Sequence, residues 1–221
     1  MQILLTAATD FEIAHFKHRL KANDDAKSKA NKHEIEFLNT GIGIPSTVYR
    51  LTNHLLKTKK KYHIVINAGI AGAFTSKFAI GQVVNVVQDE FADIGIDDKG
   101  IFTTLFEQKL LSFSEKPFTK GKLFNNSDTN LLSNIKIENA RAITVNTTSG
   151  SQQRIETLRR KFQPDIETME GAAFMYVCLS ENIPFLQIRA VSNRVEVRNI
   201  ANWDIQKAIS NLNSSLICIF E

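Results

Sequence analysis

The stretch HIVINAGIAG at residues 63–72 decides how the rest of the sequence is interpreted. Residues 63–67 are a compact apolar run, which predicts a short buried strand. The glycines at 69–72 then predict a tight turn in which the backbone comes close to a ligand. A buried strand that ends in glycines is therefore expected to carry part of a binding site.

The flanking sequence alternates short apolar runs with amphipathic stretches. Further strands are expected at residues 3–7, 34–39, 81–88, 140–145 and 185–191, and helices from the first strand to about residue 20 and at 45–57, 151–162, 170–181 and 203–220. Residues 21–33 are expected to form a polar loop, and residues 92–135 give hairpin-like pieces and a Ser/Asn-rich loop. Strands that alternate with helices imply a largely parallel sheet covered on both faces. We therefore expect an α/β fold, a single domain over residues 1–221 with three layers (α/β/α) around a central mixed sheet.

The composition excludes several classes of protein. Of 221 residues, 43% are hydrophobic and 23% are charged, which is enough apolar sequence for a sizeable core. The net charge of +4 is small and dispersed, and the basic run KTKKK at 57–61 is interpreted as a solvated helix end, so no nucleic-acid partner is expected. No apolar run reaches about 18 residues and the first residues lack a signal-peptide pattern, so we expect no membrane partner and a cytoplasmic location.

Polar residues follow several of the predicted strands. They lie at 9–12 (TDFE), 67–72 (NAGIAG), 146–151 (NTTSGS), 167–171 (ETMEG) and 192–194 (SNR). In open α/β sheets, ligands bind beyond the carboxyl ends of the strands, so these groups predict one site at a single rim. The glycines fit neither a dinucleotide fingerprint, which needs a third glycine, nor a phosphate loop, which needs a following Lys-Ser or Lys-Thr pair.

Glu170 begins a predicted helix whose next residues, Gly171, Ala172 and Ala173, are small. Small residues allow close packing, which predicts a partly buried carboxylate, and a buried carboxylate is costly without hydrogen-bond donors. Two interpretations stay open at this point. Glu170 is either a helix-start residue favoured by the helix dipole or an acceptor for two ligand hydroxyls, such as those of a ribose. Met169 beside it either packs on a sugar or belongs to the core.

Three segments carry a resemblance to a known family. The segments INAGIAGAF (66–74), IETMEGAAFMYVC (166–178) and IPFLQIRAVSN (183–193) resemble motifs of the nucleoside phosphorylase and nucleosidase superfamily, specifically its hydrolytic methylthioadenosine/S-adenosylhomocysteine nucleosidases. The match covers almost the whole chain and is weak over residues 90–135. It implies a phosphorylase/hydrolase-like fold, a small-molecule nucleoside substrate, a homo-oligomer of two or more subunits, and chemistry that needs water but no cofactor. The five histidines show no metal-ligand spacing, so no metal is expected.

The resemblance implies roles for individual residues. Glu12 would be the general base that activates water, Glu170 would hold the ribose hydroxyls, and Met169 would contact the ribose. Ser149, within the loop at residues 147–150, would lie near the base. The remaining substrate-binding residues implied near the ligand are Ile70 and Gly72 of the glycine-rich segment.

Asn193 departs from the nucleosidase pattern, because adenine-specific members have an Asp there. A carboxylate would repel the oxygen at C6 of a 6-oxopurine, whereas an amide can donate to that oxygen and accept from N7–H. The residue therefore favours hypoxanthine or guanine nucleosides, although an amide does not by itself exclude adenine. Hydrolysis is favoured over phosphorolysis, because no Arg follows the first strand and Glu12 would repel a phosphate dianion.

The segment SNRVEVRNIANWDIQKAI (192–209) resembles the futalosine hydrolases, a branch of this superfamily that removes hypoxanthine from futalosine in menaquinone biosynthesis. The substrate's 5′ side carries a carboxylated aromatic group. The resemblance implies that Arg198 or Arg194 meets its carboxylate and that Trp203 packs on its ring. Surface salt bridges and a core Trp are the other interpretation of these three residues. The alternative functions are a methylthioadenosine/S-adenosylhomocysteine nucleosidase, a 6-oxopurine nucleoside phosphorylase, or an inactive member that binds nucleosides.

Overall fold

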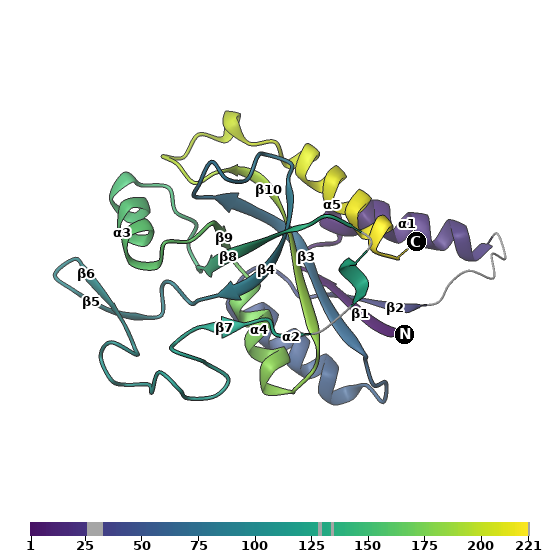
Figure 1. The fold of residues 1–221 in the computed structure, drawn as a ribbon, viewed down its shortest axis with the longest axis horizontal. Coiled ribbons are helices and arrows are strands. Elements are labelled where there is room, and N and C mark those ends of the chain that lie inside the picture. The colour runs from purple at the N-terminus through teal and green to yellow at the C-terminus, as the bar shows by residue number, and fades with distance from the viewer. Residues whose placement is uncertain (26–32, 128–129, 134, 221) are drawn as a thin grey trace.

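The computed structural model describes residues 1–25, 33–127, 130–133 and 135–220, with no side-chain description for 22–25. These residues form β1 (Gln2–Ala7), α1 (Asp10–Asp25), β2 (Glu34–Asn39), α2 (Ile44–Lys57), β3 (Ile64–Ala73), β4 (Val83–Asp89), β5 (Gly95–Asp98), β6 (Ile101–Thr104), β7 (Leu123–Phe124), β8 (Glu138–Thr144), α3 (Gln152–Phe162), β9 (Ile166–Thr168), α4 (Gly171–Ser180), β10 (Phe185–Arg194) and α5 (Ile205–Phe220) (Figure 1). Helix α1 extends into the loop expected at 21–33, and most of that loop lies outside the described residues.

Strand β3 is the centre of a mixed sheet. It pairs in parallel with β1 and β10, and its last residues pair antiparallel with β9. Strands β10, β4, β8 and β9 follow one another and return to β3, so this part of the sheet closes into a ring. Strands β1 and β2 extend from β3 outside the ring. The predicted mixed sheet is confirmed. The sequence analysis assumed that the sheet is open, and this is wrong, because five of its strands form the closed ring.

Helices cover both faces of the sheet in the three predicted layers (Figure 1). Side chains alternate along β1, so that Ile3 and Leu5 pack in one apolar cluster with α1 and α5 while Leu4 packs in another with α2 and α4. All three side chains are fully buried. Helix α3 lies apart from both pairs and packs Ile155 in a third cluster, which also contains Ile143 of β8.

The glycine turn predicted at residues 69–72 is wrong, because β3 continues straight through it to Ala73. The glycines serve the close approach of side chains instead. A Cβ on Gly69 would lie 2.7 Å from Arg189 Nη1 and 2.9 Å from Glu12 Oε1, and one on Gly72 would lie 2.9 Å from Val195 Cγ2. These approaches join β3 to α1 and β10, so the glycines do belong to the region around the expected site.

Other elements also differ from the sequence prediction. Strand β9 has only three residues and was not predicted, while β10 runs three residues past the predicted end, with an irregularity between Val191 and Asn193. Trp203 lies before α5 and not inside it. Because β9 and the extension of β10 both pair with the end of β3, long-range pairing and not local sequence defines them.

The region at residues 92–135 contains the β5–β6 hairpin and an aromatic cluster beside α4. Phe106 packs edge-on against Phe118 with ring centres 5.0 Å apart, and Phe118 contacts Tyr176 of α4. Phe113 stacks on Phe106 at 5.5 Å and is about half exposed. The predicted homo-oligomer stays a prediction. In the part of the chain that the structure describes, no helix has the length and apolar character needed to cross a membrane.

Candidate active site

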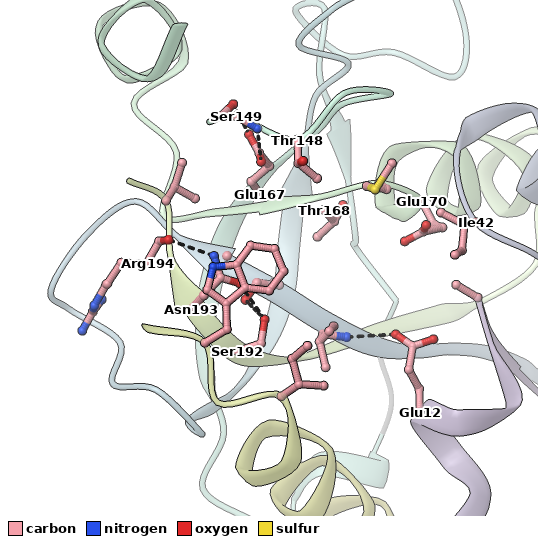
Figure 2. Close-up of a pocket in the computed structure, with 18 of the residues that line it drawn as sticks. Glu12, Ile42, Thr148, Ser149, Glu167, Thr168, Glu170, Ser192, Asn193 and Arg194 are labelled. Carbon is pink, nitrogen blue, oxygen red and sulfur yellow. Dashed lines mark hydrogen bonds between the residues drawn. The ribbon is translucent and has the colours of Figure 1, made fainter. Parts of the chain in front are cut away.

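The carboxyl ends of β1, β3 and β10 and the loop after β8 border a cavity of about 350 Å³. Cavities of this size take ligands as large as a nucleoside. Every site residue named from the sequence lines it: Glu12, Ile70, Gly72, Ser149, Met169, Glu170, Asn193, Arg198 and Trp203. Figure 2 shows Glu12 and Glu170 toward one end of the cavity and Asn193, Glu167 and Ser149 toward the other. Residues from five distant segments therefore meet at one rim.

Glu12 lies in the first turn of α1, and its side chain is buried. One carboxylate oxygen, Oε2, accepts hydrogen bonds from the Thr9 N–H at 2.9 Å and the Thr9 hydroxyl at 3.1 Å. The other, Oε1, accepts from the Ile70 N–H of β3 at 3.2 Å. Donors at both oxygens fix the orientation of the Glu12 carboxylate beside β3.

Arg189 of β10 is 1% exposed and lies among the acidic groups of the site. Burial lowers the pKa of its guanidinium, and the charges of Glu170, Glu12 and Asp89 oppose that shift. Its Nη2 group donates to Asn67 Oδ1 on β3. A buried arginine is strongly unfavourable without anionic partners, so Arg189 and the two cavity carboxylates form one electrostatic unit. The sequence analysis gave Arg189 no role, although an arginine inside the apolar run at 185–191 was a signal.

Glu170 is the residue before α4 and is 9% exposed. Its Oε1 accepts a 2.9 Å hydrogen bond from the N–H of Gly43, in the turn before α2. Burial raises the pKa of Glu170, while the Arg189 charge and the Gly43 N–H act in the opposite direction. Within the described chain, Glu170 makes no side-chain cap to its own helix, so the helix-start interpretation lacks its expected contact.

Hydroxyl groups of other strands cap α4 in place of Glu170. The Gly171 N–H donates to Thr168 Oγ1 at 3.2 Å, and the Ala172 N–H donates to Thr144 Oγ1 at 2.7 Å. Thr144 in turn donates to Asp89 Oδ1 at 3.0 Å. Asp89 is completely buried, and burial raises its pKa to about 7. The first N–H groups of α4 thus bond to the Thr168 and Thr144 hydroxyls. The Glu170 carboxylate is left to face the cavity.

Asn193 is held in a defined orientation. Its Oδ1 accepts from the Ser192 hydroxyl at 2.8 Å, and its Nδ2 donates to the Arg194 carbonyl at 2.8 Å. The amide has a second N–H and a second lone pair, which no bond within the described residues uses. Asn193 is paired with Gly72, whose missing side chain leaves room for the amide.

Glu167 of β9 is a third buried carboxylate in the cavity wall; the sequence analysis placed it at the predicted rim but gave it no role. Its Oε1 accepts from the Ser149 N–H at 2.9 Å, and its Oε2 accepts from the Ser149 hydroxyl (Figure 2). Burial raises the pKa of Glu167, while the two Ser149 donors and the Arg154 charge oppose the shift. The sequence signal was a second acidic residue in ETMEG, three positions before Glu170.

Arg198 and Trp203 border the cavity at its Ser149 end. The Arg198 guanidinium lies over the Trp203 indole, 5.4 Å from the ring centre, and the Arg198 N–H donates to the Gly150 carbonyl at 3.3 Å. Arg194 points elsewhere, because its guanidinium donates to the Thr75 carbonyl. Within the described ranges, no group of three or more His, Cys, Asp or Glu side chains is arranged to hold a metal ion.

Residues 4–216 match the family model of the phosphorylase superfamily, and the chain belongs to this superfamily. Among curated relatives, it is 27% identical over 176 residues to the futalosine hydrolase of Thermus thermophilus, covering 80% of this chain and 76% of the relative. It is also 25% identical to the 5′-methylthioadenosine/S-adenosylhomocysteine nucleosidase of Buchnera aphidicola, covering 86% of this chain and 74% of the relative. The predicted superfamily is confirmed, and the relatives leave two kinds of substrate open.

Solved structures confirm the predicted fold. The native futalosine hydrolase of Helicobacter pylori superposes with a TM-score of 0.76 at 15% identity, covering 99% of this chain and 97% of that one. The methylthioadenosine/S-adenosylhomocysteine nucleosidase of Neisseria meningitidis, in complex with methylthio-immucillin-A, gives a TM-score of 0.77 at 17% identity with the same coverage. At these identities the likeness establishes the α/β fold, and the substrate has to be argued from the side chains of the cavity.

Proposed function

We propose that this protein hydrolyses the N-glycosidic bond of futalosine and releases hypoxanthine and dehypoxanthine futalosine, a step of menaquinone biosynthesis. The observation that carries the proposal is the amide of Asn193 at one end of a cavity whose other end holds two carboxylates. The unused N–H of Asn193 donates to O6 of hypoxanthine, and its unused lone pair accepts from N7–H. A neutral amide suits a leaving group that presents an oxygen at C6.

The proposed reaction loosens the bond between C1′ and N9 toward an oxocarbenium-like state. Glu170 binds the ribose hydroxyls, with its position fixed by the Gly43 N–H. Glu12 takes a proton from the water that attacks C1′, and its negative charge also favours the positive charge that develops on the sugar. Electrons of the broken bond move into the purine, where Asn193 binds the base. N7 is protonated from solvent, because an amide supplies no proton.

Contacts at the sugar complete the proposed site. Met169, between β9 and α4, packs on the ribose, and the β3 segment with Ile70 and Gly72 lies under the nucleoside. The absence of a Cβ at Gly72 leaves room for the Asn193 amide, which binds the base. These contacts position the sugar and base over the Glu12 carboxylate.

The charges of the cavity support water as the nucleophile in place of phosphate. Glu12 and Glu170 both face the ribose end, and their carboxylates repel a phosphate dianion. The Arg189 guanidinium is 1% exposed behind them, where it offsets their charge. The ribose end therefore accepts a neutral water more readily than an anion.

The 5′ substituent leaves the sugar at the ribose end, where Phe11 and Ile42 line the cavity and are 65% and 60% exposed. Exposed apolar side chains beside a cavity suit an aromatic ring. Arg198 borders the opposite end, next to Gly150, so its predicted contact with the 5′ carboxylate requires that group to fold back over the base. We therefore assign the ring contact to Phe11 and Ile42 and place Trp203 with Arg198 beside the base.

The proposal is tested by incubating the purified protein with futalosine, inosine and methylthioadenosine, each with and without phosphate, and measuring free bases by chromatography. We expect hypoxanthine from futalosine without phosphate. A requirement for phosphate would identify a 6-oxopurine phosphorylase, and preferential release of adenine would identify a methylthioadenosine/S-adenosylhomocysteine nucleosidase, the function of several relatives. Release of no base from any substrate would leave a nucleoside-binding protein without activity.

A further inference from the structure

Glu167 is a buried carboxylate in the cavity wall that the proposed reaction leaves without a task. It is 6% exposed, and burying a charge in this way is costly unless the charge is used or fully compensated. Two nearby charges affect the pKa of Glu167: Arg154 lowers it and Asp93 raises it. A carboxylate kept at a cavity wall at this cost is a candidate for contact with the ligand.

The strand register places Glu167 in the same row as Asn193. Gly72 of β3 pairs with Glu167 of β9 on one side and with Asn193 of β10 on the other. Directly paired residues project their side chains on the same side of a sheet, so both side chains flank the Gly72 backbone, and all three residues line the cavity. Each strand lies about 4.8 Å from the next, which separates the two flanking residues by at most about 10 Å.

A purine can lie between these two side chains at this end of the cavity (Figure 2). Hydrogen bonds of about 2.9 Å to each side chain would hold the base between them. The base would then meet Asn193 along its N7/O6 edge and Glu167 along its N1 edge. Gly72 is essential to this arrangement, because a Cβ there would lie 3.2 Å from Asn193 Nδ2.

Ser149 fixes Glu167 as a hydrogen-bond acceptor. Its N–H and its hydroxyl each donate to a different carboxylate oxygen; burial raises the pKa of Glu167, and these two donors act against that shift in favour of the ionised form. The lone pairs that remain accept a hydrogen but donate none. N1 of a 6-oxopurine carries a hydrogen, whereas N1 of adenine is an acceptor.

We propose that Glu167, held by Ser149, accepts the N1–H of a 6-oxopurine and is a second base-selecting residue opposite Asn193. The proposal rests on the proposed function for the position of the base. It adds a reason for rejecting adenine that Asn193 alone does not provide, because the Glu167 lone pairs face the lone pair of adenine N1. Sites built to pair a buried polar group with a substrate N–H discriminate strongly against analogues that lack it.

The experiment measures binding of free bases, so that it does not depend on turnover. Dissociation constants of hypoxanthine, adenine and 1-methylhypoxanthine are measured by calorimetry for the wild type, for Glu167→Gln and for the control Glu156→Gln. Glu156 is an exposed residue of α3, so the control makes the same chemical change on the surface. Thermal unfolding of each variant confirms that it is folded.

We expect the wild type to bind hypoxanthine at least about tenfold more tightly than 1-methylhypoxanthine, which lacks the N1–H. Glu167→Gln should reduce the preference for hypoxanthine over adenine by about 10- to 100-fold, because its amide can donate to adenine N1. Glu156→Gln should leave the preference unchanged. Equal weakening of both bases in Glu167→Gln would show that Glu167 only anchors the Ser149 loop and would overturn the proposal.

The 1-methyl probe uses the wild-type protein, so it decides the question even if Glu167→Gln fails to fold. Equal affinity of the wild type for hypoxanthine and 1-methylhypoxanthine would also overturn the proposal. The proposed function can fail separately. A protein that does not hydrolyse futalosine but loses its hypoxanthine preference in Glu167→Gln would refute the reaction and support the base contact.

Discussion

The carboxylate of Glu170 and the N–H of Gly43 are joined by a 2.9 Å hydrogen bond across 127 positions of the chain. Gly43 has a φ of 88°, a conformation that favours glycine, and it lies directly before α2. The bond therefore ties the turn before one helix to the carboxylate before another, α4. In the proposed reaction this fixes the group that holds the ribose before the substrate arrives.

Glu170→Gln should weaken nucleoside binding and slow the reaction together. The substituted amide keeps an oxygen for the Gly43 N–H but loses the charge and the second acceptor that two ribose hydroxyls need. We expect kcat/KM to fall by about 10²-fold, from loss of a charged hydrogen bond in ground and transition states. Steady-state kinetics checks this, and an unchanged kcat/KM would remove Glu170 from the ribose site.

Glu12→Gln should lower kcat with little change in binding. The amide cannot take a proton from water, and loss of a positioned base costs about 10²–10⁴-fold in rate. Asp10→Asn is a matched control on the same helical turn, since Asp10 is exposed and pairs with Lys17. Near-normal turnover of Glu12→Gln in single-turnover measurements would exclude Glu12 as the base.

Asn193→Asp should move the preference from 6-oxopurine to adenine nucleosides. A carboxylate at this position would face O6 of hypoxanthine with negative charge, whereas it can bind protonated N7 of adenine. The Ser192 hydroxyl can still donate to the new side chain, so the local structure is expected to persist. The check is the ratio of kcat/KM for inosine and adenosine, and an unaltered ratio would show that residue 193 does not contact the base.

Asp89 should make stability depend on pH in a defined direction. Burial raises its pKa from 3.8 to about 7 in the folded protein, so the folded state binds this proton more tightly than the unfolded chain does. The resulting stabilisation is complete below the unfolded pKa and is lost as the pH rises through the folded value. Relative to Asp89→Asn, the wild type should therefore lose free energy of unfolding as the pH rises from about 4 to about 7. Urea unfolding of both proteins measures this, and a constant difference would contradict the assigned burial cost.

Much of the fold follows from local sequence. The runs at 3–7 and 34–39 match β1 and β2 to within one residue. Short compact apolar runs and alternating runs are typical of buried strands, so local sequence is enough to predict them. Strand β9 was missed because it has three residues and is defined by its pairing with β3 and β8. The glycines of β3 were assigned to a turn because their neighbours, Arg189 and Glu12, are distant in the chain.

The candidate site likewise contains residues that local motifs predict and residues that only distant contacts reveal. Glu12, Glu170 and Asn193 were named from the motifs that contain them, and the structure places all three around one cavity. Arg189 and Glu167 lie in quoted motifs but received no role, because their importance depends on Asn67, 122 positions away, and on Ser149, 18 positions away. Such pairings are set by the closing of the strand ring and have no local pattern.

The central claim is that an acidic ribose end and an amide at the base end make this protein a hydrolase of a 6-oxopurine nucleoside. It is tested most directly by kcat/KM for futalosine and for methylthioadenosine, measured in the same phosphate-free buffer. The account predicts hypoxanthine release from futalosine at a kcat/KM at least about tenfold above that for adenine release, from one charged hydrogen bond of discrimination. A higher kcat/KM for methylthioadenosine would contradict it.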